Sequence, residues 1–273
     1  MFDELKILCG DDIQINSKIT ITQPTIKQIK NFGEQKYFSA VHTLTSVGAD
    51  LKWQLWDMGI DYTKIDDFDL FITLTYRLVS SKTKLYEAFR QNPEKYKQEL
   101  SALSPKDIEE MQINPLQLTL KDIDFADFEP CEDKTHNQVI LYNAEKDIAI
   151  DRPTYRMIVD AVRQIHYLKR NNERPANERA KMDDIEDARE EAMMAKNRDY
   201  KSVLKPLMSA LSVECGLLGD DRLENLKINR FLDASKRKPH IQNANFLLQG
   251  AYSGFGSIKG IDKDKLNWAA TEI

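Results

Sequence analysis

The stretch LKINRFLDASKRKPHIQNANFLLQGAYSGFGSIKGIDKDKLNW, residues 226–268, is the part of the sequence that most clearly indicates the fold of the C-terminal region. Its apolar residues recur at helical spacing, so one face of a helix would carry Ile241, Ala244, Leu248, Ala251, Tyr252 and Phe255. Pro239 fits the first turn of such a helix, where its missing N–H costs little. The helix is expected to end at the glycines that follow, Gly254, Gly256 and Gly260.

Three interpretations of this stretch stay open. The first is a core helix closed by a glycine C-cap. The second is a partner-binding patch formed by large apolar side chains on the helix and beyond it: Ile241, Leu248, Tyr252, Phe255 and Trp268. The third is a phosphate-binding loop, against which two features argue. The glycines lack the G-x-x-x-x-G-K-[ST] order, and no apolar strand precedes them.

Composition limits the classes of protein to which the chain can belong. It has 273 residues, of which 41% are hydrophobic and 30% charged, and its formal net charge is −5. This charge argues against a general nucleic-acid binder, which needs a basic surface to release counterions. We see no apolar run of about 20 residues that would span a membrane, and no signal peptide in MFDELKILCG. The three cysteines are far apart and form no metal motif, so we expect a cytoplasmic protein without cofactors.

Apolar periodicity predicts a mainly α (α+β) fold that resembles a helical bundle and contains two small β-hairpin elements, near 6–22 and 123–150. In the first, isoleucines alternate on the two sides of Asn16-Ser17, and Ile7 and Leu8 precede a turn at residues 9–12. Thr25 is expected to cap a short helix that ends at Gly33. The strongest central helix is expected to start at Asp151 and Pro153.

A change of composition divides the chain into three parts. Residues 169–198 hold equal numbers of acidic and basic residues and few large apolar ones, which predicts a charged linker that becomes a helix after Pro175. We therefore expect an N-terminal α+β domain over 1–168 and a C-terminal helical domain over 199–273. The linker should be the interior region most sensitive to proteases. Because 1–168 is acidic and 201–273 is basic, head-to-tail self-association could use this complementarity.

A cluster of aspartates at Asp61, Asp66, Asp67 and Asp69 is the one feature that suggests an enzyme. These residues do not fit the calcium-loop register, so we expect Asp66 to cap the next helix and its neighbours to favour the positive end of the helix dipole. His42 and His166 have no ligand or catalytic partner at helical spacing and are expected at the edge of the core. We find no nucleophile–base pair and predict that the protein is not an enzyme.

Both ends of the sequence resemble proteins encoded in the tail gene module of tailed phages and prophages of Gram-positive bacteria. At the N-terminal end the resemblance rests on residues 19–26, on Phe32-Gly33-Glu34 and on residues 54–62, QLWDMGIDY. At the C-terminal end it rests on residues 204–211 and 250–255 and on Leu266-Asn267-Trp268. It thins out over 82–150 and 169–198, and its motifs are structural rather than catalytic.

The resemblance implies a tail assembly chaperone-like protein that works in the host bacterial cytoplasm. Such a protein keeps the apolar helices of the tape-measure protein soluble until the tail tube polymerises around them, by receiving helical anchors on an apolar face. The chain is longer than the small tail chaperones of this group, so a virion structural tail or baseplate component stays open as the alternative. A metal-dependent enzyme acting through the aspartate cluster is the third hypothesis.

Overall fold

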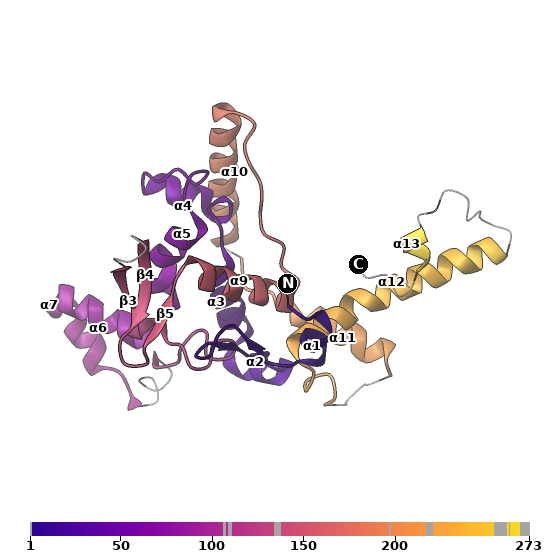
Figure 1. The fold of residues 1–273 in the computed structure, drawn as a ribbon, viewed down its shortest axis with the longest axis horizontal. Coiled ribbons are helices and arrows are strands. Elements are labelled where there is room, and N and C mark those ends of the chain that lie inside the picture. The colour runs from indigo at the N-terminus through magenta and orange to yellow at the C-terminus, as the bar shows by residue number, and fades with distance from the viewer. Residues whose placement is uncertain are drawn as a thin grey trace.

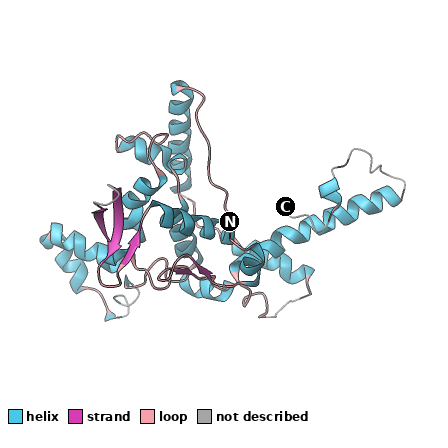
Figure 2. Ribbon diagram, in the orientation of Figure 1, coloured by secondary structure: helices cyan, strands magenta, loops and turns pink. Residues whose placement is uncertain are grey.

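The computed structural model is mainly helical and contains two small antiparallel sheets, of two and three strands (Figure 1; Figure 2). It describes residues 2–105, 108, 111–133, 138–196, 198–216, 221–253, 261 and 263–267. The prediction of a mainly α fold with β elements near 6–22 and 123–150 is confirmed.

The first β element is shorter than the sequence pattern indicated. Residues Glu4–Cys9 form the helix α1, and only β1 (Ile13–Gln14) and β2 (Thr20–Ile21) pair as a hairpin. The Asp3 carboxylate accepts hydrogen bonds from the N–H groups of Leu5 and Lys6, which begins the helix. Gly10 ends it with a φ of 85°. A strand at Ile7 and Leu8 is therefore wrong, because two helix caps enclose that segment.

Several helices surround the main core. Thr25 and Gln28 form a reciprocal capping box at the start of α2 (Ile26–Phe32), as predicted for Thr25. Gly33 separates α2 from α3 (Glu34–Thr45). The next helices are α4 (Lys52–Asp57), α5 (Asp67–Leu74), α6 (Ser81–Gln91) and α7 (Pro93–Ser101), with short 3-10 turns at Gly48–Leu51, Thr75–Leu78 and Phe125–Asp127.

The second sheet contains β3 (Glu129–Asp133), β4 (Gln138–Asn143) and β5 (Ile148–Ile150) in that order, all antiparallel. Its buried apolar side chains, from Leu141, Ile148 and Ile150, belong to the main core. The chain then enters α9 (Arg152–His166), where Asp151 is the N-cap and Pro153 lies in the first turn, as predicted. Tyr155 of α9 stacks on Phe71 of α5 with 4.5 Å between the ring centroids. These contacts place the sheet, α5 and α9 around one apolar centre.

The charged segment 169–198 contains the helix α10 (Glu178–Lys196), which stands beside α4 (Figure 1). Ile185 is 1% exposed and packs in a second, smaller core with Leu51, Leu55 and Leu70. The Lys181 ammonium lies 2.9 Å from a carboxylate oxygen of Asp61. Ile185, the partly buried Met182 and the ion pairs Lys181–Asp61 and Arg189–Asp57 thus hold α10 on the body.

We expect Ile185→Ala to release α10 and to raise the rate of trypsin cleavage within residues 178–196 by about tenfold or more, because removing a buried Ile side chain costs about 2–5 kcal/mol. Met193→Ala is the matched control, since Met193 lies on the same helix and is 63% exposed. Limited proteolysis followed by mass spectrometry measures both rates. Equal rates for the two variants would contradict this packing role.

The C-terminal residues are joined to the N-terminal ones. Glu34 caps α11 (Leu204–Glu214), because one of its carboxylate oxygens accepts from the N–H groups of Val203 and Leu204 at 2.7 and 2.8 Å. Burial raises the pKa of Glu34, but the hydrogen bond from the Ser202 hydroxyl, together with those from these two N–H groups, outweighs burial and lowers the pKa. Thr25 and Lys227 form a β-bridge. Residues from 1–168 and from 199–273 therefore share the main core, and the division into separate domains stays a prediction.

The last described helices are α12 (Ile228–Tyr252) and the short α13 (Lys263–Leu266). Pro239 lies inside α12, so the expectation that it begins a helix is wrong. The bridge at Lys227 and the fully buried side chains of Ile228 and Phe231 fix a start eleven residues earlier. Tertiary packing thus overrides the preference of proline for a first turn.

Candidate partner-binding arm

The helix α12 is anchored at its beginning and extends away from the body at its end (Figure 1). Ile228 and Phe231 are both 0% exposed in the main core. The Asn229 side-chain amide donates a hydrogen bond to the Ile165 carbonyl at 2.9 Å, which fastens α12 to α9. A helix of 25 residues is about 37 Å long. The part of α12 that follows this anchor is called the arm here, residues 237–252.

Polar contacts hold the base of the arm. The Glu214 carboxylate of α11 lies 3.6 Å from the Lys238 ammonium and accepts a hydrogen bond from the Gln242 side chain at 3.0 Å. Asn267 directly follows α13, which packs along α12, and its carbonyl oxygen lies 2.8 Å from Nε2 of His240. Contacts with Glu214 of α11 and with Asn267 therefore hold the base of the arm.

The predicted partner-binding residues are only partly brought together. Ile241 and Leu248 are half-buried on the arm, whereas Tyr252 is 86% exposed at its end. Ala244, which lies between them on the same face, is buried. Phe255 and Trp268 lie outside the described residues. On the predicted face, the side chain of Ala244 is thus buried, whereas that of Tyr252 is exposed to solvent.

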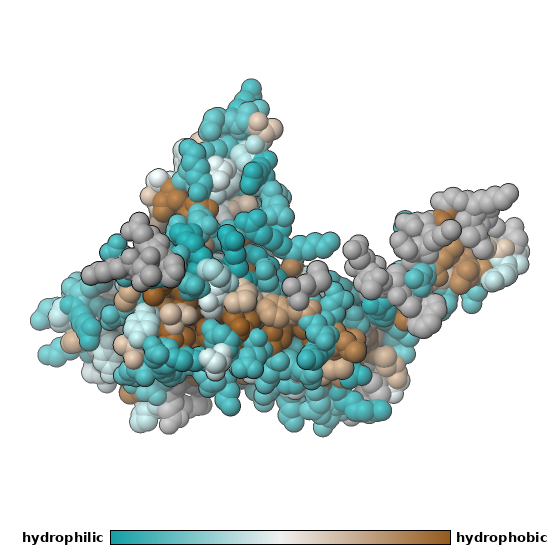
Figure 3. All heavy atoms as spheres, viewed as in Figure 1, coloured by the Kyte–Doolittle hydropathy of each residue, from teal (hydrophilic) through white to brown (hydrophobic). Residues whose placement is uncertain are grey.

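Phe246 is an exposed aromatic residue that the periodic pattern did not include. It is 70% exposed. At 100° per residue it lies about 140° around the helix from Ile241, away from the predicted face. Its signal in the sequence is a large aromatic residue between Asn245 and Leu247 on a side of the helix that is otherwise polar. Apolar atoms are visible on the outer part of the arm in Figure 3.

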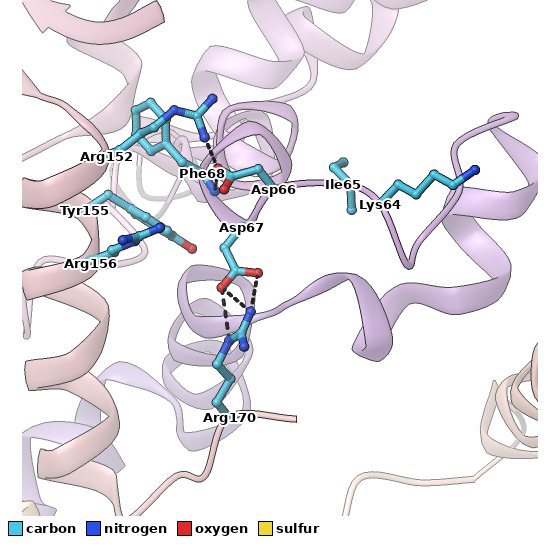
Figure 4. A pocket seen from close by; sticks show the side chains of 9 residues that line it. All are labelled: Lys64, Ile65, Asp66, Asp67, Phe68, Arg152, Tyr155, Arg156 and Arg170. Atoms are coloured by element: carbon cyan, nitrogen blue, oxygen red, sulfur yellow. Dashed lines mark hydrogen bonds and ion pairs between the residues drawn. The ribbon is translucent and has the colours of Figure 1, made fainter. Parts of the chain in front are cut away.

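The aspartate cluster is matched by basic side chains around a polar pocket of about 290 Å³ (Figure 4). Arg152 pairs with both Asp66 and Asp69, and Arg170 binds both carboxylate oxygens of Asp67 at 2.9–3.1 Å. Asp66 also caps α5 by accepting from the Phe68 N–H, as predicted. Each of these aspartates therefore has a protein cation as its partner, which is the arrangement of a structural ion-pair network.

Asp61 pairs with Lys181 outside this pocket. The hydrogen bond from Lys181 is the largest cause that lowers the pKa of Asp61, and hydrogen bonds from Thr63 add to it. Within the described part of the chain, no group of three or more His, Cys, Asp or Glu side chains is placed to hold a metal ion.

His166 lies in the core, as predicted, and is 6% exposed. Its Nε2 lies 2.7 Å from the Tyr37 hydroxyl oxygen, and its Nδ1 lies 2.7 Å from the Val162 carbonyl oxygen. Burial lowers the pKa of His166 to about 4. His42, by contrast, is exposed and contacts Ser46 of the following turn. The two histidines are therefore packing and surface residues rather than a pair.

Comparisons of the chain with protein-family models, with curated proteins and with solved structures find no match. Across the residues that the structure describes, no helix is both long enough and apolar enough to cross a bilayer. The class that the geometry defines is a helical α+β protein with a protruding helical arm.

Proposed function

We propose that this chain is a non-enzymatic phage tail morphogenesis protein, a tail assembly chaperone-like factor that binds tape-measure helices through its arm. The exposure of Phe246 and Tyr252, at 70% and 86%, is the observation that carries the proposal. Both residues lie on a helix whose first turn packs in the main core. The resemblance of both ends of the sequence to phage tail-module proteins supports the choice of partner.

Recognition on this surface would follow from burial of apolar side chains. Aromatic anchors contribute about 2 kcal/mol or more each when a partner buries them. An amphipathic helix of the partner presents anchors at i, i+3, i+4 and i+7, and a helical arm can receive them along its length. A Cβ atom added at Gly250 would meet nothing within 4 Å, so the protein leaves open space beside the arm. The site of action in this proposal is the host bacterial cytoplasm, before the tail tube closes around the tape-measure protein.

A virion structural tail or baseplate component is the second candidate. The anchoring of α12 by Ile228, Phe231 and Asn229 favours it, because a subunit of a symmetric assembly needs its contacts in a fixed direction. Mass spectrometry of purified phage particles separates the two candidates: a chaperone is absent from the mature virion, and a structural subunit is present in stoichiometric amount. A gene position directly upstream of a tape-measure gene, with a frameshift site between them, would favour the chaperone.

The double variant Phe246→Ala with Tyr252→Ala is expected to lose binding to a helical fragment of the tape-measure protein encoded beside this gene, by about a thousandfold, while its thermal melt stays unchanged. Two truncated anchors account for this magnitude, and exposed side chains contribute little to stability. Titration calorimetry measures the affinity, and circular dichroism measures the melt.

The control is Leu5→Ala with Met58→Ala, since both residues are exposed apolar side chains away from the arm, at 66% and 59%. If the arm variant binds as tightly as the unaltered chain, the arm is not the binding surface. If the unaltered chain itself does not bind tape-measure fragments, the proposed function is wrong.

A further inference from the structure

A groove between α3 and α6 is lined by basic residues, and none of its described lining residues is acidic. It has a volume of about 220 Å³ and is lined by Phe32, Lys36, Ser39, Ala40, Thr43, Arg77, Val79, Ser81, Lys84, Ile113 and Pro115. Three of these residues are cations and none is acidic. The first turn of α6 also contains no acidic residue. The groove therefore combines an apolar lining with an unbalanced charge of three positive residues.

The contacts of Lys84 show that its charge is not neutralised by a carboxylate among the residues that the structure describes. Its ammonium donates to the Arg77 carbonyl at 3.3 Å and lies 5.6 Å from the centre of the Tyr76 ring. Burial and the neighbouring Arg77 charge lower the pKa of Lys84. Among the described residues, no ion pair is formed by Lys36, Arg77 or Lys84. An occupant that brings carboxylates and an apolar anchor would match both properties of the groove.

The outward face of α10 has this chemistry. At 100° per residue, a stripe about 120° wide holds exposed acidic residues followed by two methionines: Asp183, Glu186, Asp187, Glu190, Met193 and Met194. Met193 and Met194 are 63% and 60% exposed. No ion pair within the described residues uses the four acidic side chains of this stripe. The stripe is thus acidic along most of its length and apolar at its end.

Within one chain, the acidic stripe of α10 does not line the groove between α3 and α6. In the same chain, α10 packs against α4, and the groove is lined only by residues of 32–43, 77–84 and 113–115. We infer that the chain self-associates head to tail, with the acidic, methionine-ended stripe of α10 in one copy docked in the α3–α6 groove of a second copy. The two surfaces differ, so the contact is heterologous and builds a ring or an open chain. It uses no residue of the α12 arm and does not depend on the proposed function.

Two charge-reversed variants of the full chain test each side of this contact separately. Lys36→Glu with Lys84→Glu reverses the charge of the groove and leaves the stripe unchanged. Glu186→Lys with Glu190→Lys reverses the charge of the stripe and leaves the groove unchanged. Sedimentation velocity over a concentration series should show growing assemblies for the unaltered chain and monomers for each variant. Reversed charges repel the partner surface, so each should raise the dissociation constant on the order of tenfold.

Mixing the two variants gives the decisive result. One variant then supplies the original stripe and the other the original groove, and the two reversed surfaces are also opposite in charge. The two variants should therefore assemble in alternation, although neither assembles alone. The variant that carries all four substitutions should associate again, because both surfaces have exchanged sign. Lys169→Glu with Lys201→Glu, two exposed lysines outside the groove, is the control and should assemble like the unaltered chain.

Thermal melts establish that each variant is folded before its assembly is compared. The proposal is overturned if the unaltered chain stays monomeric over the whole series, if either variant assembles like the unaltered chain, or if the mixture of variants stays monomeric. High salt should weaken the assembly of the unaltered chain, because the contact is formed by exposed charges.

Discussion

Lowering the pH from 6.5 to 4 is expected to reduce the free energy of unfolding by up to about 3 kcal/mol through one side chain, His166. Burial lowers the pKa of His166 from 6.5 to about 4 in the folded protein. The unfolded chain therefore takes up a proton near pH 6.5, whereas the folded protein does so only near pH 4. Stability from the neutral imidazole is fully present above pH 6.5 and is lost as the pH falls to 4.

Denaturant titrations at several pH values measure this loss, and His166→Gln isolates it. The variant keeps a polar group near Tyr37 but no titrating imidazole, so its stability should change less between pH 6.5 and 4 than that of the unaltered chain. His42→Gln is the control, because it replaces an exposed histidine and keeps the buried His166. The same pH dependence in all three proteins would mean that His166 is accessible to protons in the folded state.

The same substitution at two phenylalanines of α12 should change the free energy of unfolding by very different amounts. Phe231→Ala is expected to lower the free energy of unfolding by about 3–5 kcal/mol, because Phe231 is 0% exposed in the main core. Phe246→Ala should change it by less than about 0.5 kcal/mol, because Phe246 is 70% exposed. Denaturant unfolding of both variants measures the difference directly.

This pair also tests the division of α12 into an anchor and an arm. If Phe246→Ala were as destabilising as Phe231→Ala, the outer part of the helix would be packed, and partner binding would have to be sought on another surface. If Phe231→Ala were harmless, the helix would not be anchored where the structure places it.

Local signals in the sequence determined several elements correctly. Thr25, Asp66 and Asp151 begin helices because each side chain accepts a hydrogen bond from a backbone N–H two or three residues later. The apolar spacing of residues 155–166 predicts α9, and the strand-like spacing over 123–150 predicts a β-hairpin element where the structure has a three-stranded sheet. These features lie within a few residues of one another, so a sequence pattern records them.

The tertiary structure decided the features that join distant segments. Glu34 caps a helix that begins at Leu204, and Lys227 pairs with Thr25, so α12 begins before Pro239. The groove gathers residues from three separate segments, and neither its charge nor the exposure of Phe246 is visible in local periodicity. The physical reason is that burial and charge pairing depend on which surfaces meet in space, whereas capping and periodicity depend on neighbours along the chain.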